Sequence, residues 1–201
     1  MIEPKQLAVT RDGLMNLLRH RVFPNGVNTA IEVGVWRGEF SAQMCNRLQP
    51  NGFWGVDPYE LYEGYTDKPG AEFNNQTSLD QLYEAVNRNY SRINTVGTSK
   101  LLRMQGSEAA AKFEDEYFDV VYIDADHKYE AVKADIQTWW PKVRQGGVLV
   151  GHDYIERSHV EEFGVIPAVQ EFVAEHNLKF WITSEAFASW IVFKGEPVEL
   201  A

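Results

Sequence analysis

The sequence contains one cysteine, Cys45, so a disulfide bond within the chain is excluded. A chain without disulfides suits a reducing compartment, and we expect a cytoplasmic location. Phe40, Met44 and Leu48 accompany Cys45 at helical spacing. This pattern predicts that Cys45 packs in the core on the buried face of a helix and is not a nucleophile.

Basic residues are scarce as well. The chain has 19 Lys and Arg against 29 Asp and Glu, a net charge of -10, and no run of basic residues. Non-specific binding to nucleic acid depends on Lys and Arg that neutralise backbone phosphates. We therefore expect no nucleic-acid partner.

Long apolar runs, repeats and linkers are also missing. No segment approaches the roughly 20 apolar residues that a membrane-spanning helix needs. The first five residues lack the charged and then apolar layout of a signal peptide. We expect a soluble protein without a membrane partner, and 201 residues without an internal linker predict a single domain over residues 1–201.

What the sequence does contain is an alternation of short apolar segments with amphipathic ones. Strands are predicted at residues 30–33, 52–57, 101–105, 118–124, 148–150, 178–183 and 188–193, the last two as an antiparallel hairpin. Strands that alternate with helices call for a parallel sheet with helices on both faces. The predicted fold class is therefore α/β, with a doubly wound sheet.

Residues 1–24 are predicted to form an N-terminal helical segment. Leu7, Leu14, Leu17 and Leu18 recur at helical spacing, with an interruption near Gly13. The apolar stripe would pack on the domain itself or on a partner subunit, so a homo-oligomer is left open.

The most informative stretch is residues 29–41, which read as a buried strand, a glycine turn and the start of a helix. Glu32 stands at the end of the strand, and Gly34 and Gly38 let the main chain come close to a ligand. Trp36 occupies the place of the middle glycine in a dinucleotide fingerprint, and a carboxylate would repel a pyrophosphate. A cationic or zwitterionic ligand suits this turn better, although a purely structural strand–turn–helix stays open.

Polar side chains also end the other predicted strands: Asp57, Asp124 and the pair His152-Asp153. In a parallel sheet ligands gather at the carboxyl ends of the strands, so these groups are expected to converge. Asp57 has the position of an acid that accepts the two hydroxyls of a ribose, and a helix cap or loop acid is the alternative. Gly106 and Ser107 would either border a purine or merely form the N-cap of the helix predicted at residues 108–113.

Residues 58–77 are rich in Tyr, Gly and Pro and are long for a connection, which suggests a substrate lid. Tyr59, Tyr62, Tyr65 and Trp54 would line a pocket or pack within the loop. Ser78 and Gln81 form a capping-box pattern that predicts a helix from residue 78 to about residue 92.

Four of these motifs together resemble the class I S-adenosylmethionine-dependent methyltransferases. The motifs are residues 32–38, 55–57, 118–124 and the Gly146-Gly147 pair. Residues 123–130 and 151–154 are similar to the small-molecule O-methyltransferase branch of the macrocin and catechol types. The resemblance implies a Rossmann-like sheet of seven strands, the last antiparallel, with S-adenosylmethionine over the first four.

The resemblance also implies roles for single residues. Glu32, Gly34 and Gly38 would hold the methionine part, with Trp36 and Asp124 beside the cofactor. Asp57 would bind the ribose, and Gly106 and Ser107 would lie near the adenine.

In metal-dependent relatives, acids at the ends of strands four and five bind Mg²⁺. Here these positions are Asp124, His152 and Asp153. Imidazole is a poor ligand for magnesium, so another divalent metal or none is the alternative. His127, three residues after Asp124, has the offset of a general base and a suitable unperturbed pKa of about 6.5. His127 as a helix cap or solvent-facing residue, and His152 as the base or a shared base, stay open.

The predicted function is methyl transfer from S-adenosylmethionine to a hydroxyl of a small molecule such as a sugar, phenol or polyketide. A non-catalytic nucleoside-binding protein or subunit is the main alternative. A nucleic-acid or protein methyltransferase is disfavoured because no Asn-Pro-Pro-Tyr-like signature follows the fourth strand and because the chain is acidic. An NAD-linked oxidoreductase is disfavoured by Trp36.

Overall fold

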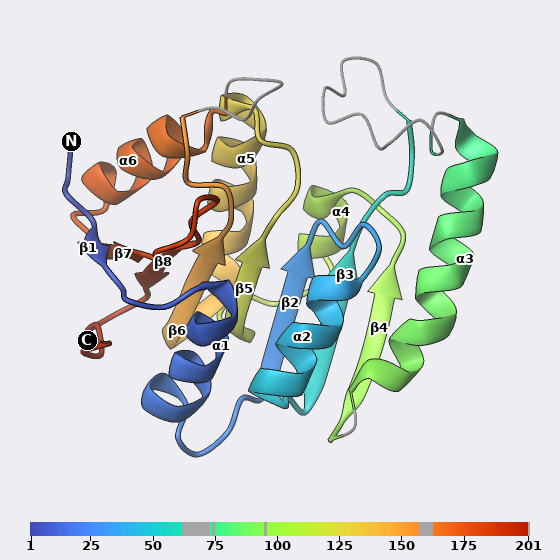
Figure 1. Cartoon of the computed structure of the whole chain (residues 1–201), viewed down its shortest axis with the longest axis horizontal. Coiled ribbons are helices and arrows are strands. Elements are labelled where there is room, and N and C mark those ends of the chain that lie inside the picture. The colour runs from blue at the N-terminus through green and yellow to red at the C-terminus, as the bar shows by residue number, and fades with distance from the viewer. Residues whose placement is uncertain (62–72, 74, 95, 157–162, 201) are drawn as a thin grey trace.

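The computed structural model describes residues 1–61, 73, 75–94, 96–156 and 163–200. These residues form one sheet of eight strands in the order β1-β7-β8-β6-β5-β2-β3-β4, with helices on both sides (Figure 1). The strands are β1 Lys5–Gln6, β2 Thr29–Val33, β3 Gly52–Val56, β4 Thr98–Leu102, β5 Phe118–Ile123, β6 Val143–Gly151, β7 Phe180–Ile182 and β8 Trp190–Phe193. The α-helices are α1 Arg11–Leu17, α2 Glu39–Leu48, α3 Gln76–Ile93, α4 Gly106–Ala110, α5 Tyr129–Trp139 and α6 Val165–Glu175, joined by the π-helix η1 Leu18–Val22 and the 3₁₀ helix η3 Trp140–Lys142.

The predicted doubly wound α/β fold is confirmed. Strands β2 to β6 pair in parallel, and β8 is antiparallel to both β6 and β7, as the predicted hairpin requires. The expected count of seven strands was too low by one. The additional strand is β1, which pairs in parallel with β7 at the edge of the sheet. Two residues are too few to give an alternating pattern in the sequence.

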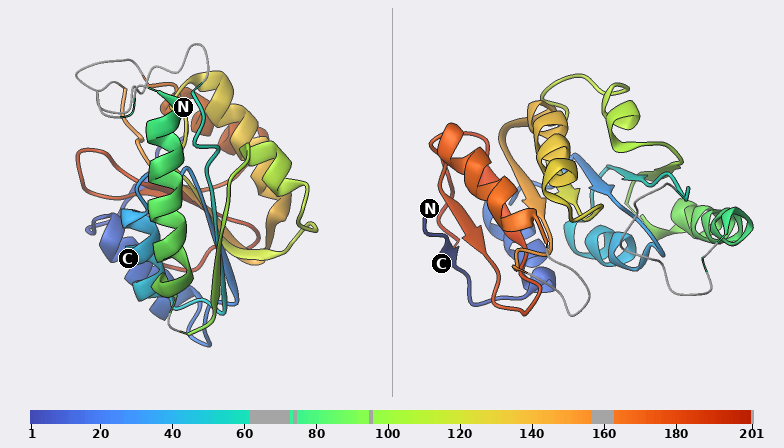
Figure 2. Two further views of the ribbon diagram at one scale, coloured as in Figure 1. Left: turned by 90° about the vertical axis from the view of Figure 1, so that its right-hand side faces the viewer. Right: turned by 90° about the horizontal axis from the view of Figure 1, so that it is seen from above.

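The sheet separates two hydrophobic cores. Helices α1, α2 and α3 cover one face, and α4, α5 and α6 cover the other, as the view from above in Figure 2 shows. Successive side chains of β5 alternate between the two faces: Val120 and Tyr122 lie in the first core, and Val121 and Ile123 in the second. Burial on both faces explains why this strand reads as a continuous apolar run.

The N-terminal segment differs from its prediction. Its helix begins only at Arg11, and Gly13 lies within α1 without interrupting it. Leu14 and Leu18 are fully buried in the core that α2 also lines, so the apolar stripe packs on its own domain. Because the helix begins only at Arg11, Lys5 and Gln6 can pair with β7 as strand β1.

Other boundaries moved by a few residues. Helix α3 is capped by Asn75, whose Oδ1 accepts a hydrogen bond from the Ser78 amide at 3.0 Å, so the capping box predicted at Ser78 is not formed. Cys45 is buried in the core, as predicted, and burial raises the pKa of its thiol. Most of the predicted lid, including Tyr62 and Tyr65, lies outside the described residues. Across the part of the chain that is described, none of the helices combines the length and apolarity that crossing a bilayer requires.

Candidate functional site

The carboxyl ends of β2, β3, β4 and β5 open into one cavity of about 410 Å³. Its walls come from the β2–α2 turn, the segment after β3, the start of α4, the segment after β5 and one face of α5. The lining residues include Gly34, Trp36, Asp57, Tyr59, Gln105, Gly106, Ser107, Asp124, Asp126, Ala131, Ala134, Asp135 and Thr138. The predicted convergence of strand ends is therefore present.

Gly34 brings two of these strand ends into contact. Its φ is +91°, and a Cβ at this position would lie 1.9 Å from the backbone oxygen of Asp124. The Gly34 amide donates to the Val56 oxygen at 2.9 Å, which also ties the turn to β3. Only glycine fits where three strand ends meet this closely.

Trp36 has a φ of +51°, and Tyr59 and Asp153, with values of +48° and +57°, share this left-handed conformation. Such backbone angles are unfavourable for residues other than glycine and are found frequently at binding sites.

Asp57 holds this turn in place. One of its oxygens accepts hydrogen bonds from the amides of Val35 and Trp36 at 3.1 and 2.9 Å, and the other accepts from the amide of Tyr59 at 2.8 Å. Burial raises the pKa of Asp57, and the three amides partly offset this effect. The Tyr59 hydroxyl donates to the Trp36 oxygen at 2.8 Å, which closes the loop. Asp57 thus lines the cavity and also shapes it, a second role that the sequence did not indicate.

Glu32 is located differently from its prediction. Its side chain is 1% exposed, accepts a hydrogen bond from the Ser41 hydroxyl and is not among the residues that line the cavity. Burial raises the pKa of Glu32 well above its ordinary value. The interpretation of Glu32 as a carboxylate that faces a ligand ammonium is therefore corrected, because its side chain turns into the core behind the turn.

Gly106 and Ser107 lie at the opposite end of the cavity, in the first turn of α4. The cap of this helix is Gln105, so the reading of Gly106 and Ser107 as the cap of a helix starting at Glu108 was wrong by two residues. Asp135 on α5 lies beside Gly106, with its Oδ1 atom 3.3 Å from the point where a Gly106 Cβ would stand, and sequence reasoning missed it. Burial raises its pKa to about 7. Its only sequence signal was a charged residue among the apolar residues of an amphipathic helix.

Trp54 does not reach this cavity. Its ring packs edge-on against Phe113, Tyr117 and Phe118, with centroids 5.6 to 5.7 Å away. Of the two alternatives for Trp54, packing is the one that the structure supports. Of the aromatic residues predicted near the pocket and described, Tyr59 lines it.

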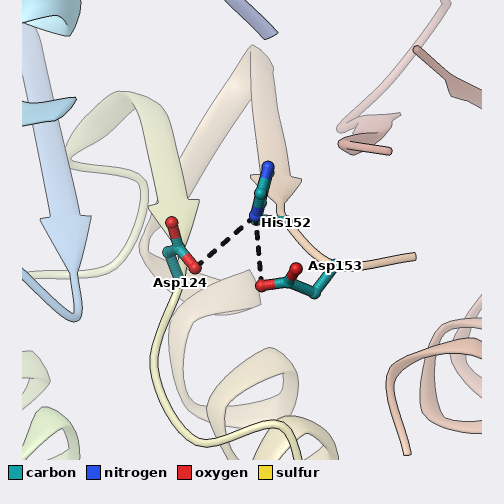
Figure 3. A group of neighbouring side chains, drawn as sticks. All are labelled: Asp124, His152 and Asp153. Carbon is teal, nitrogen blue, oxygen red and sulfur yellow. Dashed lines mark ion pairs between the residues drawn. The ribbon is translucent and has the colours of Figure 1, made fainter. Parts of the chain in front are cut away.

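A cluster of two histidines and two aspartates adjoins the cavity at Asp124. The Asp153 Oδ2 atom lies 2.9 Å from His127 Nε2 and 3.1 Å from His152 Nδ1, and the Asp124 Oδ1 atom lies 3.9 and 3.8 Å from the same nitrogens. Figure 3 shows Asp124, His152 and Asp153 pointing toward one another from the ends of β5 and β6. All four predicted residues are therefore brought together.

The electrostatics of this cluster centre on Asp153. Burial acts to raise the pKa of its carboxyl, but hydrogen bonds with His127 and His152 outweigh burial and hold the pKa well below its usual range. The His127 ring stacks on Phe163 with centroids 4.5 Å apart, and its side chain is 17% exposed. His127 is therefore neither solvent-facing nor the cap of α5, which is Lys128.

The N-terminal segment contributes a cation that the sequence did not reveal. Arg11 Nη1 lies 3.2 Å from Asp124 Oδ2, and the guanidinium stands 4.1 Å over the Phe40 ring. The Arg11 amide donates to the Glu185 carboxylate, which fixes the start of α1 against the β7–β8 connection. Asp124 is therefore partly neutralised from the far end of the chain.

The donor atoms of Asp124, His152 and Asp153 lie within 4.8 Å of one another, a spacing that suits a single divalent ion after small side-chain movements. Two carboxylates and one imidazole form a mixed oxygen and nitrogen set. This set fits Mn²⁺, Fe²⁺ or Zn²⁺ better than Mg²⁺, which prefers oxygen ligands.

Residues 31–154 match the family model described as "Methyltransferase domain", which covers the glycine turn, the cavity and the cluster. The chain belongs to this family of methyltransferase domains.

Three known proteins illustrate the similarity. The chain is 36% identical to "Uncharacterized protein y4gI" of Sinorhizobium fredii over 43% of its length, and it spans 9% of that protein. It is 25% identical to "Uncharacterized protein R132" of Acanthamoeba polyphaga mimivirus over 73% of its length, and it spans 60% of that protein. The O-methyltransferase from Bacillus cereus in complex with SAH superposes with a TM-score of 0.59 at 14% identity, over 94% of this chain and 82% of that one, which shows a shared fold.

Proposed function

We propose that the chain transfers the methyl group of S-adenosylmethionine to a hydroxyl of a small molecule. The observation that carries this proposal is that Asp124 belongs both to the cavity and to the His–Asp cluster. A nucleoside in the cavity would thereby present its methyl group next to groups able to accept a proton. The Bacillus cereus O-methyltransferase with bound SAH, which shares the fold, supports this reading.

We assign the cavity to the cofactor in three parts. The turn of Gly34, Trp36 and Gly38 takes the methionine part, and Asp57 takes the ribose hydroxyls with the acceptor capacity that three amides leave free. Gly106 and Ser107 border the adenine. Glu32 supports the turn from behind through Ser41 and does not touch the ligand in this assignment.

We assign the general base to His127. A substrate hydroxyl must lose its proton as its oxygen attacks the sulfonium methyl, and imidazole accepts a proton at neutral pH. Asp153, 2.9 Å from His127 Nε2, would orient the ring and stabilise the imidazolium that forms. His152 has a similar contact with Asp153 and is the alternative base or a metal ligand.

Asp124, His152 and Asp153 would hold a divalent metal, and a bound ion would lower the pKa of a coordinated acceptor hydroxyl. Arg11 already balances part of the charge of Asp124. The residues of this chain align the acceptor, keep the proton acceptor close and exclude water from the methyl group. With a net charge of -10 and a single buried Cys45, we further propose a cytoplasmic enzyme without a nucleic-acid or membrane partner.

The test is methyl transfer from isotopically labelled S-adenosylmethionine to a panel of sugars, phenols and polyketides, with products identified by mass spectrometry. We expect at least one O-methylated product. Treatment with EDTA should lower the rate and added Mn²⁺ should restore it, whereas Asp153→Asn should not respond to Mn²⁺. Binding of S-adenosylhomocysteine without transfer to any acceptor would support the non-catalytic alternative, and absence of binding would refute the cofactor assignment. A rate that is insensitive to EDTA would refute the metal.

A further inference from the structure

Asp135 is the acidic side chain of α5 that lines the far end of the cavity. It lies there with Ala131, Ala134 and Thr138, which present a mostly apolar helix face to the ligand space. The Oδ1 atom of Asp135 lies 3.3 Å from the point where a Cβ of Gly106 would stand. Asp135 and the start of α4 therefore enclose the same end of the cavity, away from the His–Asp cluster.

Nothing in the described part of the chain satisfies this carboxyl. None of the described residues donates a hydrogen bond to it, and the charge that acts on it is the like charge of Asp126. Burial raises the pKa of Asp135 to about 7, which reflects how poorly its charged form is compensated. A half-buried carboxyl without a donor destabilises a folded protein, and neighbours such as Ala131 and Ala134 show that small apolar residues fit this helix face. A ligand that donates a hydrogen bond to this carboxyl would account for an acidic residue at position 135.

The proposed cofactor carries such a donor at this end. With the sulfonium beside Asp124 and the ribose at Asp57, the adenine extends toward Gly106 and Ser107. An adenine offers one hydrogen-bond donor on its six-membered ring, the exocyclic 6-amino group. Main-chain atoms at Gly106 would fit the flat shape of a purine, whereas recognition of its amine requires a hydrogen-bond acceptor in the wall, and the Asp135 carboxyl is such an acceptor.

We propose that Asp135 accepts a hydrogen bond from the 6-amino group of the adenine and thereby selects an adenosyl ligand over purine nucleosides that lack this amine. This specificity role rests on the proposed function, because it takes the cofactor orientation from it. It requires no contact between Asp135 and the reacting atoms.

The experiment compares two ligands by isothermal titration calorimetry: S-adenosylhomocysteine, and its analogue in which hydrogen replaces the 6-amino group. The wild-type protein should bind the analogue about 10- to 100-fold more weakly, because a hydrogen bond to a carboxyl is lost. Asp135→Ala should reduce this ratio to below about threefold. Asp135→Asn should retain most of it, because the amide oxygen still accepts from an amine. Glu130→Gln, an exposed acid in the first turn of the same helix, is the matched control and should keep the wild-type ratio.

The possible outcomes distinguish a failure of the proposed role of Asp135 from a failure of the proposed cofactor assignment. If the wild-type protein binds neither ligand, the cofactor assignment fails and Asp135 loses its proposed partner with it. If S-adenosylhomocysteine binds but the two ligands bind equally, or if Asp135→Ala keeps the full wild-type ratio, the cofactor assignment stands and the role of Asp135 is refuted. Loss of the ratio in Asp135→Ala together with its retention in Asp135→Asn supports the proposal.

Discussion

Replacing Asp135 with Asn should make the unliganded protein more stable at alkaline pH. In the folded protein burial raises the pKa of Asp135 to about 7 from an ordinary value of 3.8. Between these two values the unfolded chain releases the proton while the folded chain retains it. The free energy of unfolding of the wild-type protein therefore decreases as the pH rises through this interval, and above about pH 7 the loss is complete.

The size of the effect follows from the two pKa values. Each pKa unit corresponds to about 1.4 kcal/mol, so the interval of about 3 units amounts to about 4 kcal/mol in total. Between pH 5 and pH 8, Asp135→Asn should gain about 3 kcal/mol over the wild-type protein as an upper limit, because water in the cavity solvates part of the charge.

Urea unfolding monitored by tryptophan fluorescence at pH 5, 6, 7 and 8 measures this difference. The other titrating groups are common to both proteins, so their contributions cancel. Glu130→Gln is again the control and should follow the wild-type protein at every pH. If the stability difference between the wild-type protein and Asp135→Asn does not change with pH, the carboxyl is not held in the environment described, and the reasoning is refuted.

Three further predictions concern the turn and the cluster. Gly34→Ala should destabilise the fold by about 4 kcal/mol in urea unfolding, because its Cβ would meet a backbone oxygen. Gly26→Ala, also at positive φ but with open space around it, should destabilise the fold by only about 1 to 2 kcal/mol. Equal losses of stability would argue against the close approach of the strands at Gly34. His127→Ala should lower turnover about 10²- to 10⁴-fold while S-adenosylhomocysteine still binds in calorimetry. His20→Ala, a change at an exposed histidine, is the control. Undiminished turnover of His127→Ala would show that His127 takes no part in the reaction. Asp57→Ala should weaken S-adenosylhomocysteine binding by at least about tenfold, since both a ribose acceptor and the acceptor of three turn amides are lost, and an unaltered dissociation constant would contradict both roles.

The fold was predictable because most of its elements are local. The buried strands are apolar runs that end in a polar residue, and that residue marks the carboxyl end where a parallel sheet binds its ligands. Asp57, Asp124 and the His152-Asp153 pair could be assigned to one edge for this reason alone. The short strand β1 escaped detection because its pairing with β7 is a tertiary contact between distant segments.

Side-chain direction was the part that the sequence could not supply. Glu32 and Asp57 both belong to strand ends, yet one side chain turns into the core toward Ser41 and the other lines the cavity. Arg11 contacts Asp124, which is 113 residues away in the sequence, and no local sequence pattern predicts such a contact. Asp135 lies on a helix that reads as ordinary amphipathic structure, so only its place in the assembled fold reveals it.

The pairing of β1 with β7 has a consequence for handling the protein. Lys5 and Gln6 occupy the outer hydrogen-bonding side of β7, and the Leu7 amide extends this cover by donating to the Ile182 oxygen at 2.8 Å. Shortening the amino terminus past these residues would leave the main-chain groups of β7 open to strands from neighbouring molecules. A variant lacking residues 1–7 should therefore form aggregates in light scattering even where its ligand cavity is intact.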